Sequence, residues 1–302
     1  MKIYFKRQDH VSFSQMFAKL SEVLKEKYGC EIIDGSTKIE HIPYELFGGD
    51  MLIHYENEDR YTLLSLSDYQ SPMHRFFIER NNEKDQIFYS QMAGSTYYDN
   101  KNRKYNFKVN NFIYLPKTLL IDYDEYYNMR KEETEYLDKF IFRGNVMGRG
   151  RMTIPMFENN EYFTGYKGIN IKDYYKELTN HKISLSVPGT GELCYRDIEC
   201  MAIGIPILRY EFLTELNPKL IPNYHYISID RIEPESMSSG LKFRTERKGG
   251  QDYYEGYIKR FMEVKDDDEF LSTISKNARK YYEDYLHPKS LINHVLNITK
   301  LW

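Results

Sequence analysis

The hydrophobic and polar positions of this chain follow two patterns in turn, one typical of strands and one typical of amphipathic helices. Lys2 to Phe5, with three apolar residues in succession after the lysine, are predicted to form a short strand. Ser12 then stands three residues before Gln15, the spacing of a capping box at the start of a helix. Apolar residues recur at helical spacing from there to Gly29, a residue type that commonly ends helices. The chain therefore opens with a predicted strand followed by a helix.

More short apolar runs bounded by turn residues predict a first α/β domain over residues 1–135. Its further strands are expected at Ile32-Ile33, Met51 to Ile53, Leu63 to Leu66, Ile87 to Tyr89 and Phe112 to Leu115. The charged, helix-favouring stretch from Tyr126 to Lys139 is interpreted as the connection to a second domain.

The same alternation predicts a second α/β domain over residues 136–286. Its strands are expected at Phe140 to Phe142, Ile183 to Ser186, Pro206 to Leu208 and Tyr226 to Ile229, and its helices at Leu193 to Ile203, Tyr253 to Val264 and Glu269 to Tyr285. Residues 287–302 hold a last amphipathic helix, which we expect to pack back on the first domain. The predicted fold class is α/β, with two Rossmann-like domains facing a central cleft.

Composition narrows the possible functions. The chain has 42 basic and 45 acidic residues spread along its length, for a net charge of -3, which disfavours nucleic-acid binding. Its three cysteines have no C-x-x-C spacing, so neither a disulfide framework nor a zinc site is expected, and the pattern fits the cytoplasm. No apolar stretch is long enough for a secretory leader or a membrane anchor, so we expect membrane contact to be peripheral at most.

The segment from Pro188 to Pro206 carries the clearest chemical signal. It reads as a glycine-bearing loop and a helix between two strands, and Gly189 and Gly191 would let a ligand approach the backbone closely. The start of the helix directs free N–H groups and a positive dipole end at the same place, which suits a diphosphate. The alternative is an ordinary turn between strand and helix.

Side chains at the start of this helix add to the prediction. Glu192 and Arg196 are four residues apart, as are Tyr195 and Glu199, so each pair shares a side of the helix. Arg196 could bind phosphate through two parallel hydrogen bonds, and Glu199 could accept ribose hydroxyls. In the alternative, Glu192 and Arg196 form a surface ion pair. The candidate donor-nucleotide residues here are Pro188, Gly189, Gly191, Glu192, Tyr195, Arg196 and Glu199.

The stretch from Gly191 to Ile207 resembles the donor-binding segment of exostosin-like glycosyltransferases, which have GT-B architecture. That family shows Arg, then Glu, then Ala-x-Gly-x-Pro, and the matching residues here are Arg196, Glu199, Ala202, Gly204 and Pro206. The resemblance implies that Arg196 and Glu199 contact the donor nucleotide.

A second resemblance lies at Phe142-Arg143-Gly144, which is similar to the Phe-Arg-Gly segment of exostosin-like and CAP10-like glycosyltransferases. The preceding strand would deliver Arg143 and Gly144 to its carboxyl end, where α/β sheets bind ligands. Arg149 and Arg151 follow closely, and together the arginines predict a phosphate site. The alternative is a basic surface loop.

Transfer of a sugar to a hydroxyl also needs a base. Asp68 follows the apolar run Leu63 to Leu66 and is the first candidate, with His74 as the next and His54 and His10 behind it. Asp68 would otherwise be a helix N-cap or a turn residue.

Two acidic clusters raise the question of a metal. Asp122 and Asp124 end an apolar run in the Asp-x-Asp pattern by which GT-A glycosyltransferases hold a divalent cation. The triplet Asp266 to Asp268 is better explained as a helix start. Because the arginines already offer counter-charge for a diphosphate, we expect neither a metal nor another cofactor.

These observations together predict a hexosyl- or pentosyltransferase that moves a sugar from a nucleoside-diphosphate sugar to a hydroxyl of a glycan acceptor. The resemblance implies UDP as the nucleotide, since UDP donors are the commonest in the resembling families, and the reaction is expected to be inverting and independent of metal. Two alternatives stay open. One is a metal-dependent GT-A enzyme that uses Asp122 and Asp124, and the other is a non-catalytic carbohydrate- or nucleotide-binding module rich in tyrosine.

Overall fold

The computed structural model describes residues 1–5, 15–34, 39, 41–46, 50–65, 72–80, 82–90, 111–113, 129, 136–144, 151–187, 194–212, 218–229 and 247–299. The chain divides into two compact units. Unit 1 comprises Met1–Ile121, Thr214–Pro218 and Pro288–Trp302, and unit 2 comprises Asp122–Leu213 and Lys219–His287. Each unit is built on one sheet with helices, and most strand pairs are parallel, so the predicted α/β class is confirmed.

The described part of unit 1 contains a six-stranded sheet in the order β2-β1-β3-β4-β5-β6. The strands are β1 (Lys2–Phe5), β2 (Glu31–Asp34), β3 (Asp50–Tyr55), β4 (Arg60–Ser65), β5 (Gln86–Ser90) and β6 (Asn111–Ile113). β3 runs antiparallel to both of its neighbours, while the remaining pairs are parallel. β3 and β4 are joined only by the short 3-10 turn Glu56–Glu58, which accounts for their antiparallel pairing, because a parallel crossover needs a dozen or more residues.

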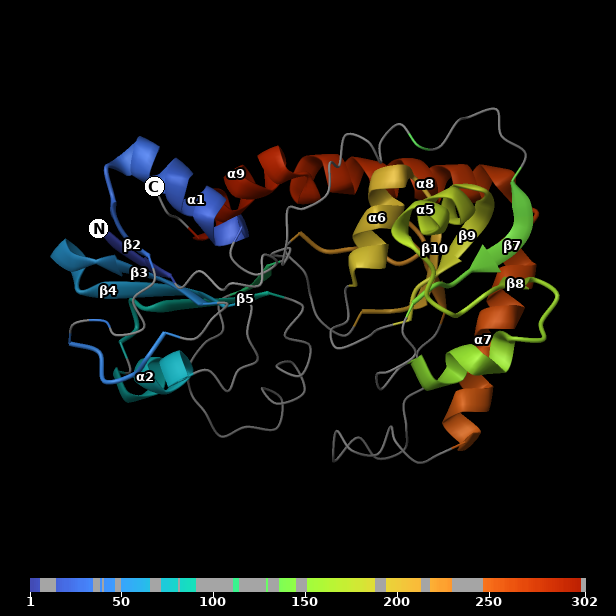
Figure 1. The fold of residues 1–302 in the computed structure, drawn as a ribbon, viewed down its shortest axis with the longest axis horizontal. Coiled ribbons are helices and arrows are strands. Elements are labelled where there is room, and N and C mark those ends of the chain that lie inside the picture. The colour runs from blue at the N-terminus through green and yellow to red at the C-terminus, as the bar shows by residue number, and fades with distance from the viewer. Residues whose placement is uncertain are drawn as a thin grey trace. The chain divides into compact units, whose positions relative to one another are not determined.

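Helices cover both faces of the unit 1 sheet. α1 (Gln15–Tyr28) and α9 (Pro288–Thr299) lie on one face, and α2 (Pro72–Arg80) lies on the other (Figure 1). The backbone N–H of Gly29 donates to the Lys25 carbonyl at 2.9 Å, so α1 ends where the sequence predicts. α9 contributes buried side chains to the same core as α1 and the central strands; they are Leu291, Ile292, Val295 and Leu296.

The described part of unit 2 contains a five-stranded sheet in the order β11-β10-β9-β7-β8, and every neighbouring pair is parallel. The strands are β7 (Leu137–Ile141), β8 (Phe163–Thr164), β9 (His181–Leu185), β10 (Ile207–Tyr210) and β11 (Ile227–Ile229). Its helical elements are η2 (Arg151–Phe157), α5 (Ile171–Thr179), α6 (Tyr195–Ile203), α7 (Arg247–Val264) and α8 (Asp268–Tyr281), followed by the π-helical turn Tyr282–Leu286.

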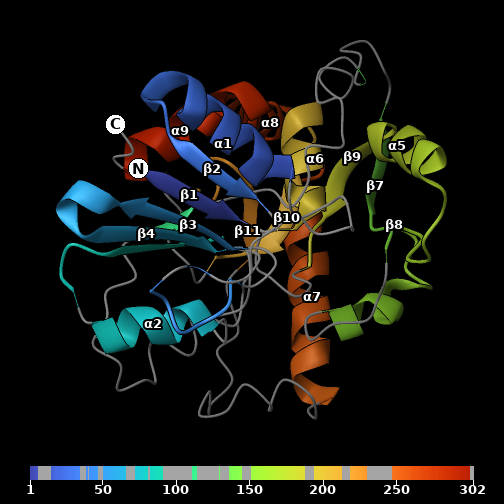
Figure 2. The ribbon, with the colours of Figure 1, turned by 60° about the vertical axis from the view of Figure 1, so that its left-hand side comes forward.

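Successive side chains of β10 point to opposite faces of the unit 2 sheet and show which helices pack on each face. Leu208 and Tyr210 belong to a buried cluster with Tyr257 and Phe261 of α7, and η2 contributes to the same cluster. Arg209, between them, instead pairs with a residue of α6. α7 and η2 therefore cover one face of the sheet, and α6 covers the other (Figure 2).

Most predicted elements lie within a few residues of their expected bounds, with the following differences. β7 begins at Leu137, so the end of the stretch interpreted as a connection is a strand. The helices α2 and α5, the 3-10 helix η2 and the short strand β8 were not predicted. The prediction that the acidic triplet starts a helix is confirmed, because Asp267 caps α8 and its carboxylate accepts the Phe270 N–H at 3.0 Å. Ser12 lies outside the described residues.

Candidate donor-binding site

The chain leaves the two central strands of unit 2 in opposite directions. β7 and β9 are neighbours, but the segment after β7 leads to β8 on one side and the segment after β9 leads through α6 to β10 on the other. In open parallel sheets, such a divergence marks the place outside the carboxyl ends of the strands where ligands bind. The described residues at this edge are the end of β7 with Phe142 to Gly144, the end of β9 with Ser186 and Val187, and the first turn of α6.

Arg196, the second residue of α6, is the central side chain of this edge. It is 8% exposed, and its guanidinium lies 4.0 Å from the centroid of the Phe142 ring. Its Nη2 donates to the Arg143 carbonyl. Nε and Nη1 are buried and have no hydrogen-bond partner within the described ranges. Buried donors are seldom left unpaired, because losing water without a replacement bond is costly. Nothing in the described ranges pairs with these two nitrogens, so they are available to a ligand as far as those ranges show.

Arg151, the first residue of η2, lies beside the same ring. Its guanidinium is 5.6 Å from the Phe142 centroid. Nε donates to the Val187 carbonyl at 3.4 Å, and Nη2 lies 3.7 Å from Cys194 Sγ, immediately before α6. Two of the predicted arginines are thus brought together around one aromatic ring at a helix start. A diphosphate fits this combination of two guanidinium charges at a helix start with the two Arg196 nitrogens that lack partners in the described ranges.

Gly144 makes room for Arg196. Its φ is +148°, a conformation that side-chain-bearing residues rarely adopt, and a Cβ placed on it would be 2.9 Å from Arg196 Nη2. Glycine at position 144 therefore leaves space for the Arg196 side chain. The role predicted for this glycine from the sequence was a different one, contact with the donor nucleotide.

The Arg143 side chain turns to another partner. Its Nε and Nη2 donate to the two carboxylate oxygens of Glu177 on α5, at 2.8 and 3.0 Å. Nη1 donates to the Lys167 carbonyl at 3.4 Å. Arg143 therefore takes part in the edge through its backbone carbonyl, while its guanidinium is held in a two-pronged ion pair.

Glu199 is also occupied. It is 9% exposed, and its two oxygens accept the hydroxyls of Tyr174 at 3.1 Å and Tyr175 at 2.9 Å. Burial raises the pKa of the Glu199 carboxyl, against the opposing effects of these hydroxyls and of Arg196. The two tyrosines come from α5 and were not among the predicted site residues. In a chain with 29 tyrosines, nothing in the sequence marks these two.

The remaining predicted residues lie at the start of α6, in unit 1 or outside the described residues. Tyr195 opens α6, and burial raises its pKa to about 12. His54 stacks on Tyr61 with ring centroids 4.2 Å apart, and His74 lies in α2. The other candidates lie outside the described residues; they are His10, Asp68, Asp122, Asp124, Arg149, Pro188, Gly189, Gly191 and Glu192.

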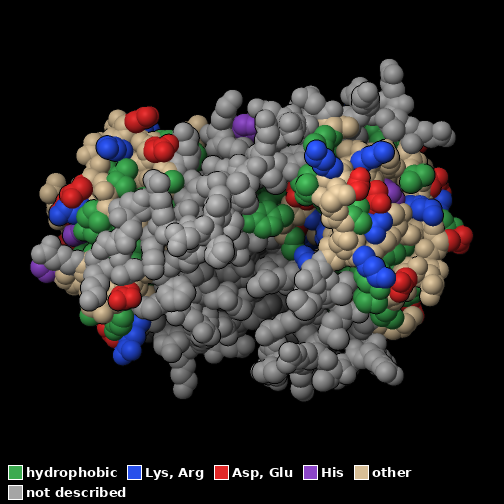
Figure 3. All heavy atoms as spheres, viewed as in Figure 1, with side chains coloured by type: hydrophobic (Ala, Val, Ile, Leu, Met, Phe, Trp, Pro, Cys, Tyr) green, Lys and Arg blue, Asp and Glu red, His purple; other side chains and the backbone are tan. Residues whose placement is uncertain are grey.

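The described residues contain neither a metal-binding cluster nor a membrane-spanning helix. Among them, no three His, Cys, Asp or Glu residues gather in a way that could hold a metal ion. None of the helices in the described ranges has both the length and the apolar composition of a membrane span. On the face in Figure 3, basic and acidic side chains are interspersed over the described surface.

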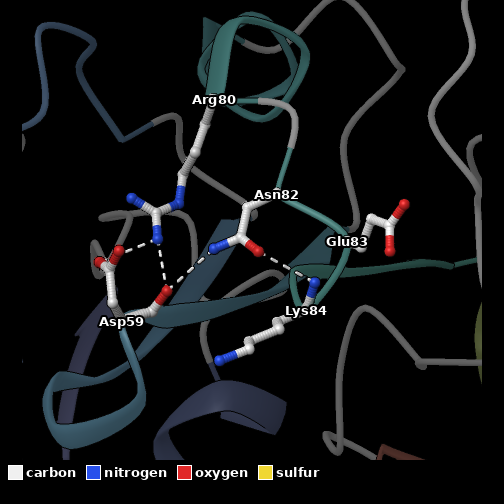
Figure 4. Close-up of a pocket in the computed structure, with 5 residues that line it drawn as sticks. All are labelled: Asp59, Arg80, Asn82, Glu83 and Lys84. Carbon is white, nitrogen blue, oxygen red and sulfur yellow. Dashed lines mark hydrogen bonds and ion pairs between the residues drawn. The ribbon is translucent and has the colours of Figure 1, made fainter.

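A hollow of about 550 Å³ in unit 1 is lined by Asp59, Arg80, Asn82, Glu83 and Lys84 (Figure 4). Arg80 pairs with the Asp59 carboxylate at 2.8 Å and with Asp85 at 2.9 Å. Asn82 donates to the Asp59 carbonyl at 3.0 Å. These contacts join the turn before β4 to the loop before β5, at the amino ends of the two strands. Since ligands of α/β sheets bind at the carboxyl ends, we assign this cluster a structural role.

Comparisons with known proteins give the following similarities. No protein-family model and no curated protein matches the chain. Among solved structures, the chain is similar to TarM of S. aureus at 8% identity with a TM-score of 0.40, over 84% of this chain and 64% of that one. It is similar to the pneumococcal O-GlcNAc transferase GtfA, solved with UDP and GlcNAc, at 10% identity with a TM-score of 0.40, over 84% and 65%. It is also similar to WaaG, a glycosyltransferase involved in lipopolysaccharide biosynthesis, at 9% identity with a TM-score of 0.32, over 97% and 99%. The chain thus spans slightly less than two thirds of the length of TarM and GtfA.

Proposed function

We propose that this chain is a glycosyltransferase of GT-B architecture. It transfers a hexosyl or pentosyl group from a nucleoside-diphosphate sugar, with UDP as the expected nucleotide, to a hydroxyl of a glycan acceptor in the cytoplasm. The observation that carries the proposal is the buried Arg196 guanidinium at the carboxyl edge of β7, whose Nε and Nη1 lack partners among the described residues.

The chemistry of the leaving group supports this assignment. When the anomeric bond breaks, negative charge grows on the departing diphosphate, and preorganised donors lower the energy of that state. The guanidinium groups of Arg196 and Arg151 offer such positive charge beside one ring, at the positive dipole end of α6. They supply the counter-charge that a divalent cation supplies in metal-dependent transferases, so we propose a metal-independent reaction.

We assign different roles to the two predicted residues that already have partners. Arg143 positions Arg196 through its carbonyl and is itself fixed by Glu177. Burial acts to lower the pKa of Arg196, and we assign Glu199 the role of one of the neighbours that raise this pKa and so favour the charged form. The ribose contact predicted for Glu199 would have to compete with two tyrosine hydroxyls.

Nucleotide binding by Arg196 is the decisive test. Arg196→Ala removes a charge-assisted contact of about 1.5–3 kcal/mol, so we expect the Kd for the preferred nucleotide to rise by about tenfold to a hundredfold. Titration calorimetry with UDP, GDP and ADP on the wild-type protein identifies that nucleotide first.

Lys182→Ala is the matched control for Arg196→Ala. Lys182 is a half-buried cation of the same sheet, but it pairs with Asp138 at 3.1 Å at the amino edge. Its loss should leave the Kd unchanged. A folded Arg196→Ala protein that binds as tightly as the wild type would remove the donor-site assignment.

The acceptor side of the proposal depends on Asp68. We propose that this carboxylate takes the proton from the acceptor hydroxyl as the hydroxyl attacks the anomeric carbon, with inversion. Asp68→Asn should leave nucleotide binding intact and lower turnover by ~10² to 10⁴. Rates of release of nucleoside diphosphate check this, and a near-normal rate would exclude Asp68 as the base in favour of His74.

A further inference from the structure

A buried ion pair connects α6 to β10. Arg209 of β10 is 1% exposed and Asp197, the third residue of α6, is 0% exposed. Arg209 Nη1 lies 3.1 Å from Asp197 Oδ2. Neither residue was among the predicted site residues, because an isolated arginine in a strand and an aspartate in a helix carry no signal of their own.

The same oxygen of Asp197 closes the first turn of α6. Oδ2 accepts the backbone N–H of Cys194 at 2.6 Å, and the Asp197 N–H donates to the Cys194 carbonyl at 3.0 Å. This is the helix-side half of a capping box. Arg209 therefore holds the carboxylate that fixes the residue at which the helix begins.

Cys194 in turn is connected to both arginines of the candidate site. Arg196 is two residues away, within the first turn. Arg151 Nη2 lies 3.7 Å from Cys194 Sγ. A shift of the start of α6 would thus move the Arg196 guanidinium relative to Phe142 and change the surroundings of Arg151.

Stability alone does not account for a charged residue at position 209. The Arg209 guanidinium lies 3.4 Å from the Phe212 ring centroid, and its Nε donates to the Tyr210 carbonyl at 3.3 Å. Withdrawing both charges from water offsets most of what their attraction contributes, and apolar replacements for such pairs are often equally stable. An apolar pair would lack the acceptor oxygen at position 197, and Arg209 keeps that oxygen in place by pairing with its charge.

We propose that Arg209 is a positioning residue of the donor site, which acts through Asp197 and Cys194 to hold the first turn of α6 and with it Arg196. This inference rests on the proposed function, since the ligand is the diphosphate of the donor.

Two variants test the role of Arg209. Arg209→Met keeps the length of the side chain and leaves the Asp197 charge buried without its partner. Asp197→Asn combined with Arg209→Met removes both charges but keeps an oxygen that can accept the Cys194 N–H. Calorimetry gives the Kd for UDP, and amide hydrogen exchange reports on Cys194 to Asp197.

The two variants should differ. Displacing a binding group by a fraction of an ångström to an ångström lowers binding strongly, so Arg209→Met should raise the Kd by about tenfold or more and speed exchange at the start of α6. The double variant should return both readouts close to wild type. A folded Arg209→Met protein with unchanged Kd and exchange would overturn the proposal, as would a folded double variant that fails to recover.

A second pair of variants keeps the proposal testable if the Arg209→Met protein does not fold. If Arg209→Met alone does not fold, Asp197→Asn with Arg209→Met is compared with Asp197→Leu with Arg209→Met. Both lack the ion pair, and only the first keeps the acceptor for Cys194, so only the first should bind UDP. Equal binding by the two would overturn the proposal. If the wild-type protein binds no nucleoside diphosphate, the proposed function fails, and the exchange data alone decide whether Arg209 holds the helix start.

Discussion

At the scale of single residues, chemically similar groups acquire different roles from their surroundings. Arg143 and Arg196 both lie in segments that resemble one family, yet Arg143 pairs with Glu177, 34 residues along the chain, while Arg196 keeps two nitrogens without partners in the described part. The residue types could be predicted from the sequence. Their partners could not, because those contacts depend on which elements the fold places side by side.

His225 illustrates how burial sets a pH dependence. The side chain is 8% exposed, and its Nδ1 accepts the Ile221 N–H at 2.8 Å, which requires the neutral ring. Burial lowers the pKa of His225 from 6.5 to about 4. Between these values the unfolded chain takes up a proton that the folded protein does not, so stability is present above pH 6.5 and is lost as the pH falls towards 4.

His225→Gln should therefore weaken the acid sensitivity of unit 2. Protonation of His225 in the unfolded chain lowers the free energy of unfolding of the wild type by at most about 3 kcal/mol, and the variant should not show this loss. Urea unfolding at pH 7 and at pH 4.5 measures the difference, with the pH 7 value of each protein as its own reference. If both proteins lose the same free energy of unfolding, the histidine is not responsible.

At the scale of elements, the boundaries of α6 are fixed at both ends. Asp197 fixes the first turn. At the other end Gly204 has a φ of +82°, its N–H donates to the Cys200 carbonyl at 2.8 Å, and its own carbonyl accepts Ser275 Oγ at 2.6 Å. The glycine is thus part of the connection between α6 and α8.

Gly204→Ala should destabilise unit 2 by roughly 1–2 kcal/mol, because alanine is strained at this φ and its Cβ would lie 3.2 Å from Ser275 Oγ. Gly256→Ala is the control. Gly256 lies within α7 with no atom near its added Cβ, so alanine there should stabilise by about 0.5–1 kcal/mol. Thermal unfolding should show opposite shifts in Tm, and a shift of the same sign in both would contradict the role given to Gly204.

The elements themselves were largely predictable. Apolar runs such as Ile183 to Ser186 appear as β9 (His181–Leu185), because alternation and helical spacing are local properties of a sequence. The direction of β3 was missed, although the few residues between β3 and β4 already require a reversal. α5 was missed as well, and with it Tyr174, Tyr175 and Glu177, which hold Glu199 and Arg143.

At the scale of the whole molecule, the two units differ in how the chain builds them. Unit 2 is formed almost entirely by one run of sequence, Asp122–Leu213 and Lys219–His287. Unit 1 combines the beginning of the chain with Pro288–Trp302, and α9 supplies buried residues that include Leu291 and Val295 to its core.

This arrangement sets an order of events on the ribosome. Domains fold as units while the chain is being made. The strands described for the unit 1 sheet emerge before unit 2, but the core they enclose stays open on the α9 side until residue 296 has been synthesised. Unit 2 can finish folding before that point. Unit 1 thus starts to be translated before unit 2 but completes its core after unit 2, and during that interval chaperones would find its apolar surface exposed.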